Sequence, residues 1–330
     1  MPNPNAPLGG IKLSANVNLD SEDAYLRYLV QIGVTHCYTW LPGLADRYDE
    51  IARFRDKLAA LGLTLYNAGD YGIAKSPRIH LGLPGREEDF DAFRRMLATL
   101  GRLGLTVTTF TWEPDQVWTT GQTRVRGGAL ARAVDARLLE TAGLRHGRVY
   151  DKDELWRYFS DLMAAVLPAA EEAGVRLALH PNDPPLPRIA GVDCLITSAE
   201  DYRKAFRLAG SPYLGMEFCC GCWLEGGADF GDLLAGIREF VSQGRVLVTH
   251  FRNVSSTLPA FHETLVDEGY ADMLSILQAF YEAGYDGTLI LDHLLEQETP
   301  DITLYGGTGY ALGYIKALMN VASRRAAGRL

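Results

Sequence analysis

Four residues with side chains that commonly bind metal ions stand at or beside the ends of β-like segments in the C-terminal half of the chain. They are His180, Cys219, His250 and Asp292, and the segments are RLALH, YLGMEFC, RVLVTH and GTLILD. A ring of parallel strands brings strand ends together at one face even when they are far apart in sequence. The pattern therefore predicts one site with nitrogen, sulfur and oxygen donors. Such a mixture suits Mn²⁺, Fe²⁺, Co²⁺, Ni²⁺ or Zn²⁺ better than Mg²⁺ or Ca²⁺.

Glu217 is a competing ligand on the same segment as Cys219. Side chains on a strand alternate between its two faces, so Glu217 and Cys219 point the same way and Cys220 points the other. Glu217 is then either the fourth ligand in place of Cys219 or a fifth group. A lone buried Cys is more often a small hydrophobe, and the site prediction depends on the joint placement of all these residues.

Eight β-like segments alternate with eight amphipathic segments along the chain. The expected strands are 11–17, 35–41, 63–69, 106–112, 176–181, 213–220, 245–254 and 287–293. The expected helices are 21–32, 45–61, 87–103, 153–173, 198–209, 230–241, 270–283 and 309–325. This count predicts a (β/α)8 TIM barrel, with residues 1–330 forming a single domain. An open doubly wound sheet is the alternative, but no Gly-rich phosphate-binding motif follows an early strand.

Two connections are longer than a barrel needs, at about 70–86 after the third strand and 113–152 after the fourth. Both leave the carboxyl ends of strands, where a barrel builds its active site. We therefore expect them to form lids or walls for a substrate.

Composition limits the classes of function. The chain has 330 residues, 47% of them hydrophobic, with 32 Lys and Arg against 41 Asp and Glu, a net charge of −9. The lack of a basic run disfavours a nucleic-acid partner, and no apolar run approaches the ~18 residues of a membrane span. The first residues do not resemble a secretory signal. Because the five cysteines are odd in number and clustered, we expect a reduced, cytoplasmic protein.

Several motifs resemble the mannonate dehydratase family. They are LALHPNDPPLPRI (177–189), EFCCGCW (217–223), HFRNV (250–254), FHE (261–263), ADM (271–273) and LDH (291–293). The resemblance is specific over about 176–313 and implies a (β/α)8 barrel of the xylose-isomerase-like type. It also implies a divalent metal, typically Mn²⁺, and the conversion of D-mannonate into 2-keto-3-deoxy-D-gluconate.

The resemblance implies roles for individual residues. It assigns the metal to the same four positions, His180, Cys219, His250 and Asp292. The histidine after the ligand aspartate, implicated in catalysis in this family, corresponds to His293. A further catalytic tyrosine corresponds to Tyr305, with Tyr310 as the alternative.

Residues beside these motifs are the expected substrate contacts: Arg252, Asn253, His262, Glu263, Asn182 and Trp112. Arg252 suits a bidentate bond to a carboxylate, and a structural ion pair is its alternative. His262 and Glu263 are expected either at substrate hydroxyls or as partners that orient a histidine. A turn role for Asn182 and a packing role for Trp112 also stay open.

The departures from the family leave the substrate open. Asn182 stands in place of an expected Asp, DHL replaces DHG, and LVDEGYADM lacks an expected His. The first prediction is a metal-dependent dehydratase of a mannonate-like sugar acid, expected as a homo-oligomer. A metal-dependent sugar isomerase or epimerase is the main alternative. A phosphodiester-cleaving barrel and a non-catalytic sugar-binding module are the others.

Overall fold

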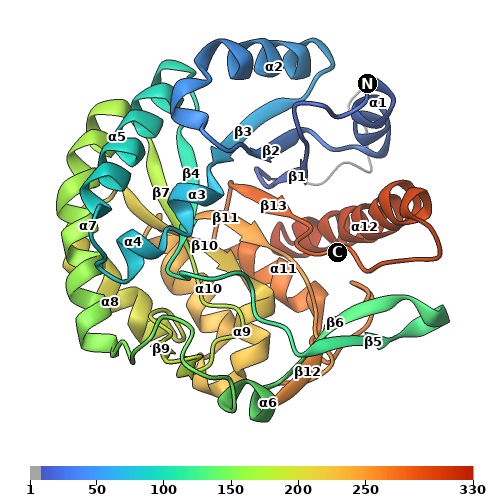
Figure 1. Cartoon of the computed structure of the whole chain (residues 1–330). Helices are drawn as coiled ribbons and strands as arrows, with labels where there is room; N and C mark the ends of the chain where they lie inside the picture. Colours follow the sequence, from blue (N-terminus) through green and yellow to red (C-terminus); the bar gives the residue numbers. More distant parts are fainter. Residues whose placement is uncertain (1–8, 330) are drawn as a thin grey trace.

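The computed structural model describes residues 9–329, in which eight parallel strands close into a barrel (Figure 1). The order around the ring is β1-β13-β11-β10-β7-β4-β3-β2. The strands are β1 (Lys12–Asn16), β2 (His36–Trp40), β3 (Thr64–Gly69), β4 (Val107–Thr111), β7 (Arg176–His180), β10 (Leu214–Cys219), β11 (Val246–His250) and β13 (Thr288–Ile290). The predicted (β/α)8 barrel is confirmed.

Long helices surround the strands, as Figure 1 shows. They are α1 (Asp23–Ile32), α2 (Tyr48–Ala60), α5 (Arg86–Arg102), α7 (Lys152–Ala173), α8 (Ala199–Ala209), α10 (Leu233–Ser242), α11 (Met273–Glu282) and α12 (Thr308–Ala326). In α7 the buried residues Leu155, Phe159, Leu162 and Val166 recur every three or four positions, which places them on one face of the helix. The helix ends at Gly174, whose φ of 68° is left-handed and suits glycine at a C-terminal cap.

A small apolar cluster crosses the interior of the barrel. It joins Val107 of β4, Ala178 of β7, Val248 of β11 and Ile290 of β13. Because β4 is not adjacent to β11 or β13 in the ring, contacts among these residues must span the lumen. The interior of the barrel is therefore a packed core and not an open channel.

The connections after the strands carry structure of their own. They contain α3 (Tyr71–Ala74), α4 (Pro77–His80), β5 (Gly121–Arg124), β6 (Leu130–Asp135), α6 (Ala136–Glu140), β8 (Arg188–Ile189), β9 (Val192–Asp193), α9 (Cys220–Gly226) and β12 (Ala260–His262). Short 3-10 segments lie at Leu44–Asp46, Arg126–Gly128 and Gly227–Asp229, and a π-helix spans Ile302–Gly307.

The two long connections differ from structureless loops. The first holds α3 and α4, while the second holds β5, β6 and α6. β6 pairs antiparallel with both β5 and β12, so a strand from the C-terminal half completes a three-stranded sheet. Figure 1 shows the β5–β6 hairpin extending at one side of the barrel. In residues 9–329, no helix is long and apolar enough to cross a membrane.

Candidate metal centre

The strand ends place the predicted metal ligands around one point. His180 ends β7, Cys219 ends β10 and His250 ends β11, while Asp292 follows β13 by two residues. Cys219 lies beside His250 in the β10–β11 register. Three strands that are adjacent in the ring, with β13 beyond them, therefore deliver four side chains to the same side of the barrel.

Donor atoms of these residues are close enough to hold one ion. Potential ligand atoms lie within 4.8 Å of one another in the set His180, Glu217 and His250, and again in the set Cys219, His250 and Asp292. His250 Nε2 is 2.7 Å from Glu217 Oε1, and Cys219 Sγ is 3.7 Å from Asp292 Oδ2. Since the sets share His250, the five residues form a single cluster, which we call the metal cluster.

One buried nitrogen of the metal cluster lacks a hydrogen-bond partner, as expected of an atom that binds a metal ion. His250 Nδ1 is buried and has no hydrogen-bond partner, although it lies 3.2 Å from Asp292 Oδ1. A buried polar atom without a partner is costly unless another group, such as a metal, satisfies it. The donors are imidazole, thiolate and carboxylate, the mixture that borderline transition ions prefer.

The electrostatics of the metal cluster favour anionic ligands. Burial opposes ionisation of the Cys219 thiol, but hydrogen bonds from Cys222 and His180 and the charge of Arg252 hold its pKa well below the usual value. The Cys222 amide N–H donates to Cys219 Sγ at 3.4 Å. Burial opposes protonation of His180, yet Cys219 and Glu217 raise its pKa to about 9. Binding of a cation would therefore displace protons from the histidines.

His293 lies beside the metal cluster and is held by a carboxylate. Its Nδ1 is 2.7 Å from Glu263 Oε1, and its Nε2 is 3.3 Å from Asp292 Oδ1. The side chain is 35% exposed and lines the same cavity as the metal cluster. Burial lowers the pKa of His293, but the charges of Asp292 and Glu263 outweigh it and raise the pKa to about 9. The ring is oriented and accessible, as proton transfer requires.

Arg252 is part of a buried ion-pair network behind the metal cluster. Its Nε donates to Asp292 at 2.6 Å, its Nη1 to Glu225 at 2.7 Å and its Nη2 to Asp183 at 2.7 Å. Only 3% of the side chain is exposed. The structure therefore shows Arg252 in the ion pairs of the alternative role, and its contact with substrate stays a prediction.

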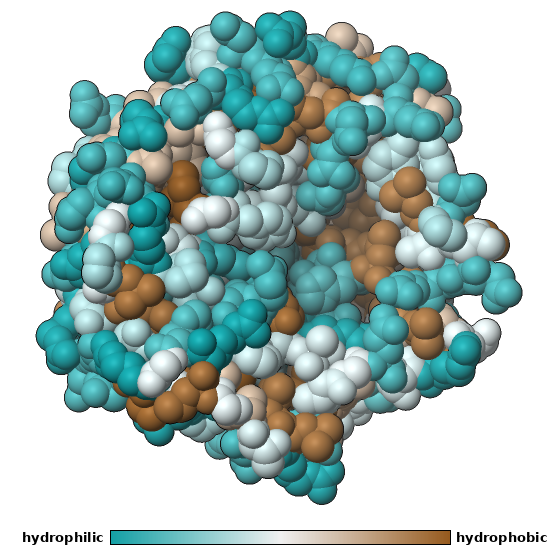
Figure 2. All heavy atoms as spheres, viewed as in Figure 1, coloured by the Kyte–Doolittle hydropathy of each residue, from teal (hydrophilic) through white to brown (hydrophobic). Residues whose placement is uncertain are grey.

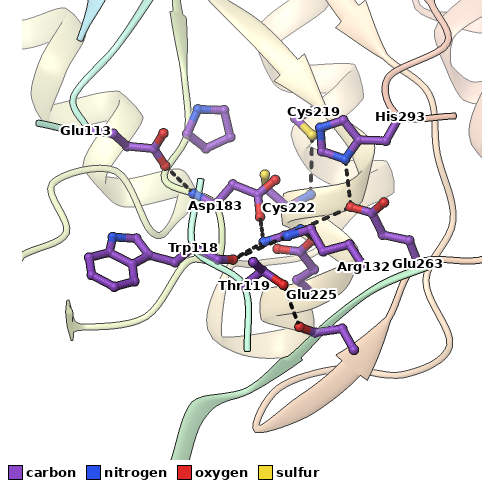
Figure 3. A network of polar contacts seen from close by, with 12 residues as sticks. Glu113, Trp118, Thr119, Arg132, Asp183, Cys219, Cys222, Glu225, Glu263 and His293 are labelled. Carbon is purple, nitrogen blue, oxygen red and sulfur yellow. Dashed lines mark hydrogen bonds and ion pairs between the residues drawn. The ribbon is translucent and has the colours of Figure 1, made fainter. Parts of the chain in front are cut away.

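Arg132 extends this network from β6, as Figure 3 shows. Its guanidinium lies 2.6 Å from Asp183 and 3.1 Å from Glu263, and it also donates to the carbonyl of Trp118. Glu263 accepts from both Arg132 and His293 through the same oxygen. Of the two alternatives for Glu263, the structure shows a partner that orients a histidine.

The backbone at Gly221 leaves the space that Arg252 occupies. A Cβ built on Gly221 would lie 2.3 Å from Arg252 Cζ, which is closer than real atoms approach. We expect Gly221→Ala to displace the guanidinium from buried carboxylates and to destabilise the fold by several kcal/mol, on the order of a broken buried pair (~3–5 kcal/mol).

Thermal unfolding by circular dichroism checks this prediction against Gly313→Ala. Gly313 is exposed on α12, and its added Cβ would meet nothing within 4 Å. Alanine there should leave the melting temperature unchanged or raise it, since glycine costs about 1 kcal/mol inside a helix. Equal melting temperatures for the two variants would contradict the steric role of Gly221.

A cavity of about 160 Å³ opens over the metal cluster. Figure 2 shows this side of the molecule as hydrophilic at its edge and hollowed within. The lining residues that periodicity alone did not single out are Tyr38, Trp40, Asn67, Tyr71, Ala74, Lys75, Thr109, Phe110, Thr111, Glu113 and Val117. Several lie two residues apart at the ends of β2 and β4, so strand alternation could have found them. Both long connections contribute to the wall, the first through Tyr71 and Lys75 and the second through Glu113 and Val117.

Three more of the expected substrate contacts have side chains that pack against or hydrogen-bond to other parts of the protein. Trp112 is 1% exposed and packs 4.6 Å from the His80 ring. The Asn182 side chain donates to the carbonyl of Trp112 and accepts from the backbone of Ile196. Asn253 is buried and donates to the carbonyl of Ala271. These side chains are already engaged in packing and in hydrogen bonds between loops, and their contact with substrate stays a prediction.

His262 is also outside the cavity that the metal cluster lines. It lies on β12, opposite Ala133 of β6, and its Nδ1 is 2.9 Å from the carbonyl of Glu263. The alternation of a strand explains the difference from its neighbour: Glu263 reaches inward to His293 while His262 does not.

The two expected catalytic tyrosines lie away from the metal cluster. Tyr305 is in the π-helix and packs 5.6 Å from Tyr25 and 5.3 Å from Tyr28, both on α1. Tyr310 is exposed on α12, with its hydroxyl 3.1 Å from Arg126. Neither lines the cavity over the metal cluster. This geometry does not support a catalytic role for either tyrosine, and the assignment stays a prediction.

Comparisons with known proteins identify the family of the chain. The family model described as D-mannonate dehydratase (UxuA) matches residues 135–327, more than half of the chain. Mannonate dehydratase 2 of Halalkalibacterium halodurans is 26% identical over 310 residues, covering 83% of this chain and 87% of the relative. Mannonate dehydratase of Thermotoga maritima is 26% identical over 320 residues, with 84% and 88% covered.

Solved structures share the fold. Mannonate dehydratase from Streptococcus suis serotype 2 superimposes with a TM-score of 0.83 at 24% identity, covering 97% of this chain and 95% of that one. The 3-keto-D-glucoside 4-epimerase from E. coli reaches only 0.61 at 13% identity, with 91% and 98% covered. By its sequence and its barrel, the chain belongs to the D-mannonate dehydratase family of hydro-lyases.

Proposed function

We propose that this protein is a divalent-metal-dependent dehydratase of a sugar acid, with D-mannonate as the first substrate to test. The single observation that carries the proposal is the cluster of mixed donors in the cavity that also holds the His293 imidazole. Membership of the family supports the same reaction class.

The proposed ligands are His180, Cys219, His250 and Asp292. Glu217 is either an alternative to Cys219 or a fifth ligand, because its carboxylate also lies beside His250. We propose Mn²⁺ as the ion, with Fe²⁺, Co²⁺, Ni²⁺ or Zn²⁺ as alternatives that the donor set would accept. When bound, the ion supplies positive charge next to the negative charge that develops on the substrate.

Dehydration breaks two bonds of the substrate. The C2–H bond gives up its proton to a base, the C3–O bond breaks, and the hydroxyl leaves as water after it gains a proton. The resulting enol rearranges to the 2-keto-3-deoxy acid, so D-mannonate yields 2-keto-3-deoxy-D-gluconate and one water. Both proton transfers need a group of suitable pKa within hydrogen-bond reach.

His293 is the residue that we assign to proton transfer, through Nε2. Its Nδ1 is occupied by Glu263, which leaves Nε2 as the atom on the side of Asp292. The charges of Asp292 and Glu263 raise the pKa of the imidazole to about 9, so it can donate a proton to the leaving hydroxyl. Once deprotonated, the same atom can accept the C2 proton. Arg132 holds Glu263 in place and thereby fixes the direction of the ring.

Elemental analysis followed by an activity assay tests the proposal. We expect purified protein to hold about one divalent ion per chain and to lose turnover on chelation, because the reaction needs the charge of the ion. Reloading with each candidate ion should restore activity to different extents. D-Mannonate should give a product lighter by one water, detected by mass spectrometry and NMR. An isomeric product without loss of water would favour the isomerase alternative, and protein that neither binds nor needs an ion would overturn the proposal.

A further inference from the structure

We propose that Lys75 binds the carboxylate of the substrate at the side of the cavity opposite the metal cluster. This inference rests on the proposed function, because it names the group that recognises the acid end of a sugar acid. Lys75 follows β3, and β3 stands four places from β11 in either direction around the eight-stranded ring. Lys75 and His250 thus approach the cavity from opposite strands.

The charge of the cavity wall calls for a cation at this position. Four carboxylates line the cavity, those of Glu113, Asp183, Glu217 and Asp292. Lys75 is the only lysine or arginine that lines it, among the residues that the structure describes. An anionic ligand would meet unfavourable charge elsewhere on the wall unless the metal or Lys75 compensates for it. Within this cavity, Lys75 is therefore the cationic side chain that an acid substrate can reach.

The two nearby arginines cannot take this role. The Arg252 guanidinium is 3% exposed and donates to three carboxylates, those of Asp292, Glu225 and Asp183. Arg132 is likewise occupied by Asp183 and Glu263. Neither lines this cavity. Arg132 does line an adjoining cavity beside Asp292 and His293, but there its guanidinium is already paired with carboxylates. A substrate carboxylate could recruit them only by breaking buried ion pairs, which is costly.

The Lys75 ammonium retains donors for a ligand. Its Nζ lies 3.1 Å from Glu113 Oε2, and within residues 9–329 it has no other hydrogen-bond or ion-pair partner. An ammonium has three N–H donors, so two are left on the side of the cavity. The side chain is 12% exposed, and a hydrogen bond from a charge in such a sheltered place is stronger than one at the surface.

The position of Lys75 is fixed by its surroundings. Glu113 Oε1 accepts the backbone N–H of Asp183 at 2.6 Å, so the carboxylate that holds Lys75 is itself anchored, as Figure 3 shows. Lys75 is the C-terminal cap of α3, and its backbone N–H donates to the carbonyl of Tyr71, the first residue of that helix. Asp70 caps that helix and also accepts from the backbone of Gly43. An ammonium held in this way is positioned before the ligand arrives, which lowers the entropic cost of binding.

The competing explanation is that Lys75 and Glu113 form a purely structural ion pair. Two ligands that differ only in the carboxylate, D-mannonate and D-mannitol, distinguish substrate binding from this structural role. The metal-loaded double variant K75M/E113Q removes both charges, so no buried carboxylate is left unpaired. We expect its KM for D-mannonate to rise about 10- to 100-fold with kcat within about threefold, as for loss of a charge-assisted hydrogen bond that is made equally in ground and transition states. D-Mannitol, which has a neutral hydroxymethyl group in place of the carboxylate, should inhibit wild type and variant equally.

The conservative variant K75R keeps the positive charge and should recover most of the affinity for D-mannonate. Circular dichroism first establishes that the variants are folded. If K75M/E113Q is folded and turns over D-mannonate with the wild-type KM, the inference about Lys75 is wrong while the proposed function stands. Equal losses of affinity for D-mannonate and D-mannitol would also overturn it, because they would indicate a general change of the cavity. If the wild-type protein dehydrates no sugar acid, the proposed function itself fails.

Discussion

Replacing Cys219 with alanine should lower the affinity of the protein for the divalent ion by at least about 100-fold. Removal of a group that only orients a metal ligand costs up to about 100-fold, and loss of a ligand itself should cost no less. The thiolate lies 3.7 Å from Asp292 and is stabilised by the Cys222 amide N–H. Alanine would leave the histidines and carboxylates without their sulfur donor. Isothermal titration calorimetry measures the effect, with Mn²⁺ added to protein from which a chelator has removed the metal.

The adjacent cysteine provides a matched control. Cys219 and Cys220 are both fully buried, so truncation of either removes a similar amount of packed surface. Cys220 begins α9 and, within residues 9–329, belongs to none of the groups of potential ligands. Cys220→Ala should therefore keep the wild-type affinity for Mn²⁺. If Cys219→Ala retains the ion while Glu217→Gln loses it, the carboxylate rather than the thiolate is the fourth ligand.

The strand-end chemistry was predictable because it needs only short-range information. RLALH and RVLVTH carry the apolar pattern of a buried strand, with β-branched residues in the second, and each places its histidine at the last position. Once the repeated strand–helix units indicate a barrel, topology brings these ends together. The boundaries were less exact: Cys220 begins a helix, and β11 ends at His250.

Roles decided by long-range contacts were not predictable in this way. Arg252 has the chemistry to bind a carboxylate, and only the arrival of Asp183 and Glu225 from other connections makes it a buried ion-pair partner. Tyr305 packs on α1, nearly 280 positions earlier in the chain. No local sequence pattern predicts such a contact, because it depends on how the last elements of the barrel pack against the first.

The second long connection illustrates the same limit. Its length indicated a functional wall, but the pairing of β6 with β12 depends on a strand over a hundred residues away. That pairing is what brings Arg132 to Glu263 and so to His293. A residue without any motif of its own therefore supports the group that we assign to proton transfer.

Replacing His293 with asparagine should lower kcat by about 10²- to 10⁴-fold, the usual contribution of a positioned acid or base. The asparagine amide can still donate to Glu263 in place of Nδ1, but it offers no proton-transfer group in place of Nε2. Because His293 is not among the potential ligand groups of the described residues, the variant should bind Mn²⁺ as wild type does. Steady-state kinetics with D-mannonate, together with metal analysis of the same samples, gives both quantities.

Two further variants separate proton transfer from orientation. Glu263→Gln keeps the shape of the side chain but weakens its hold on Nδ1, so kcat should fall by a smaller factor, about 10- to 100-fold. His262→Asn changes the neighbouring residue, which faces away from the cavity, and should alter kcat by less than about twofold. If His293→Asn keeps wild-type turnover, another group moves the proton. If it loses both turnover and Mn²⁺, His293 acts through the metal centre, and its assignment to proton transfer must be withdrawn.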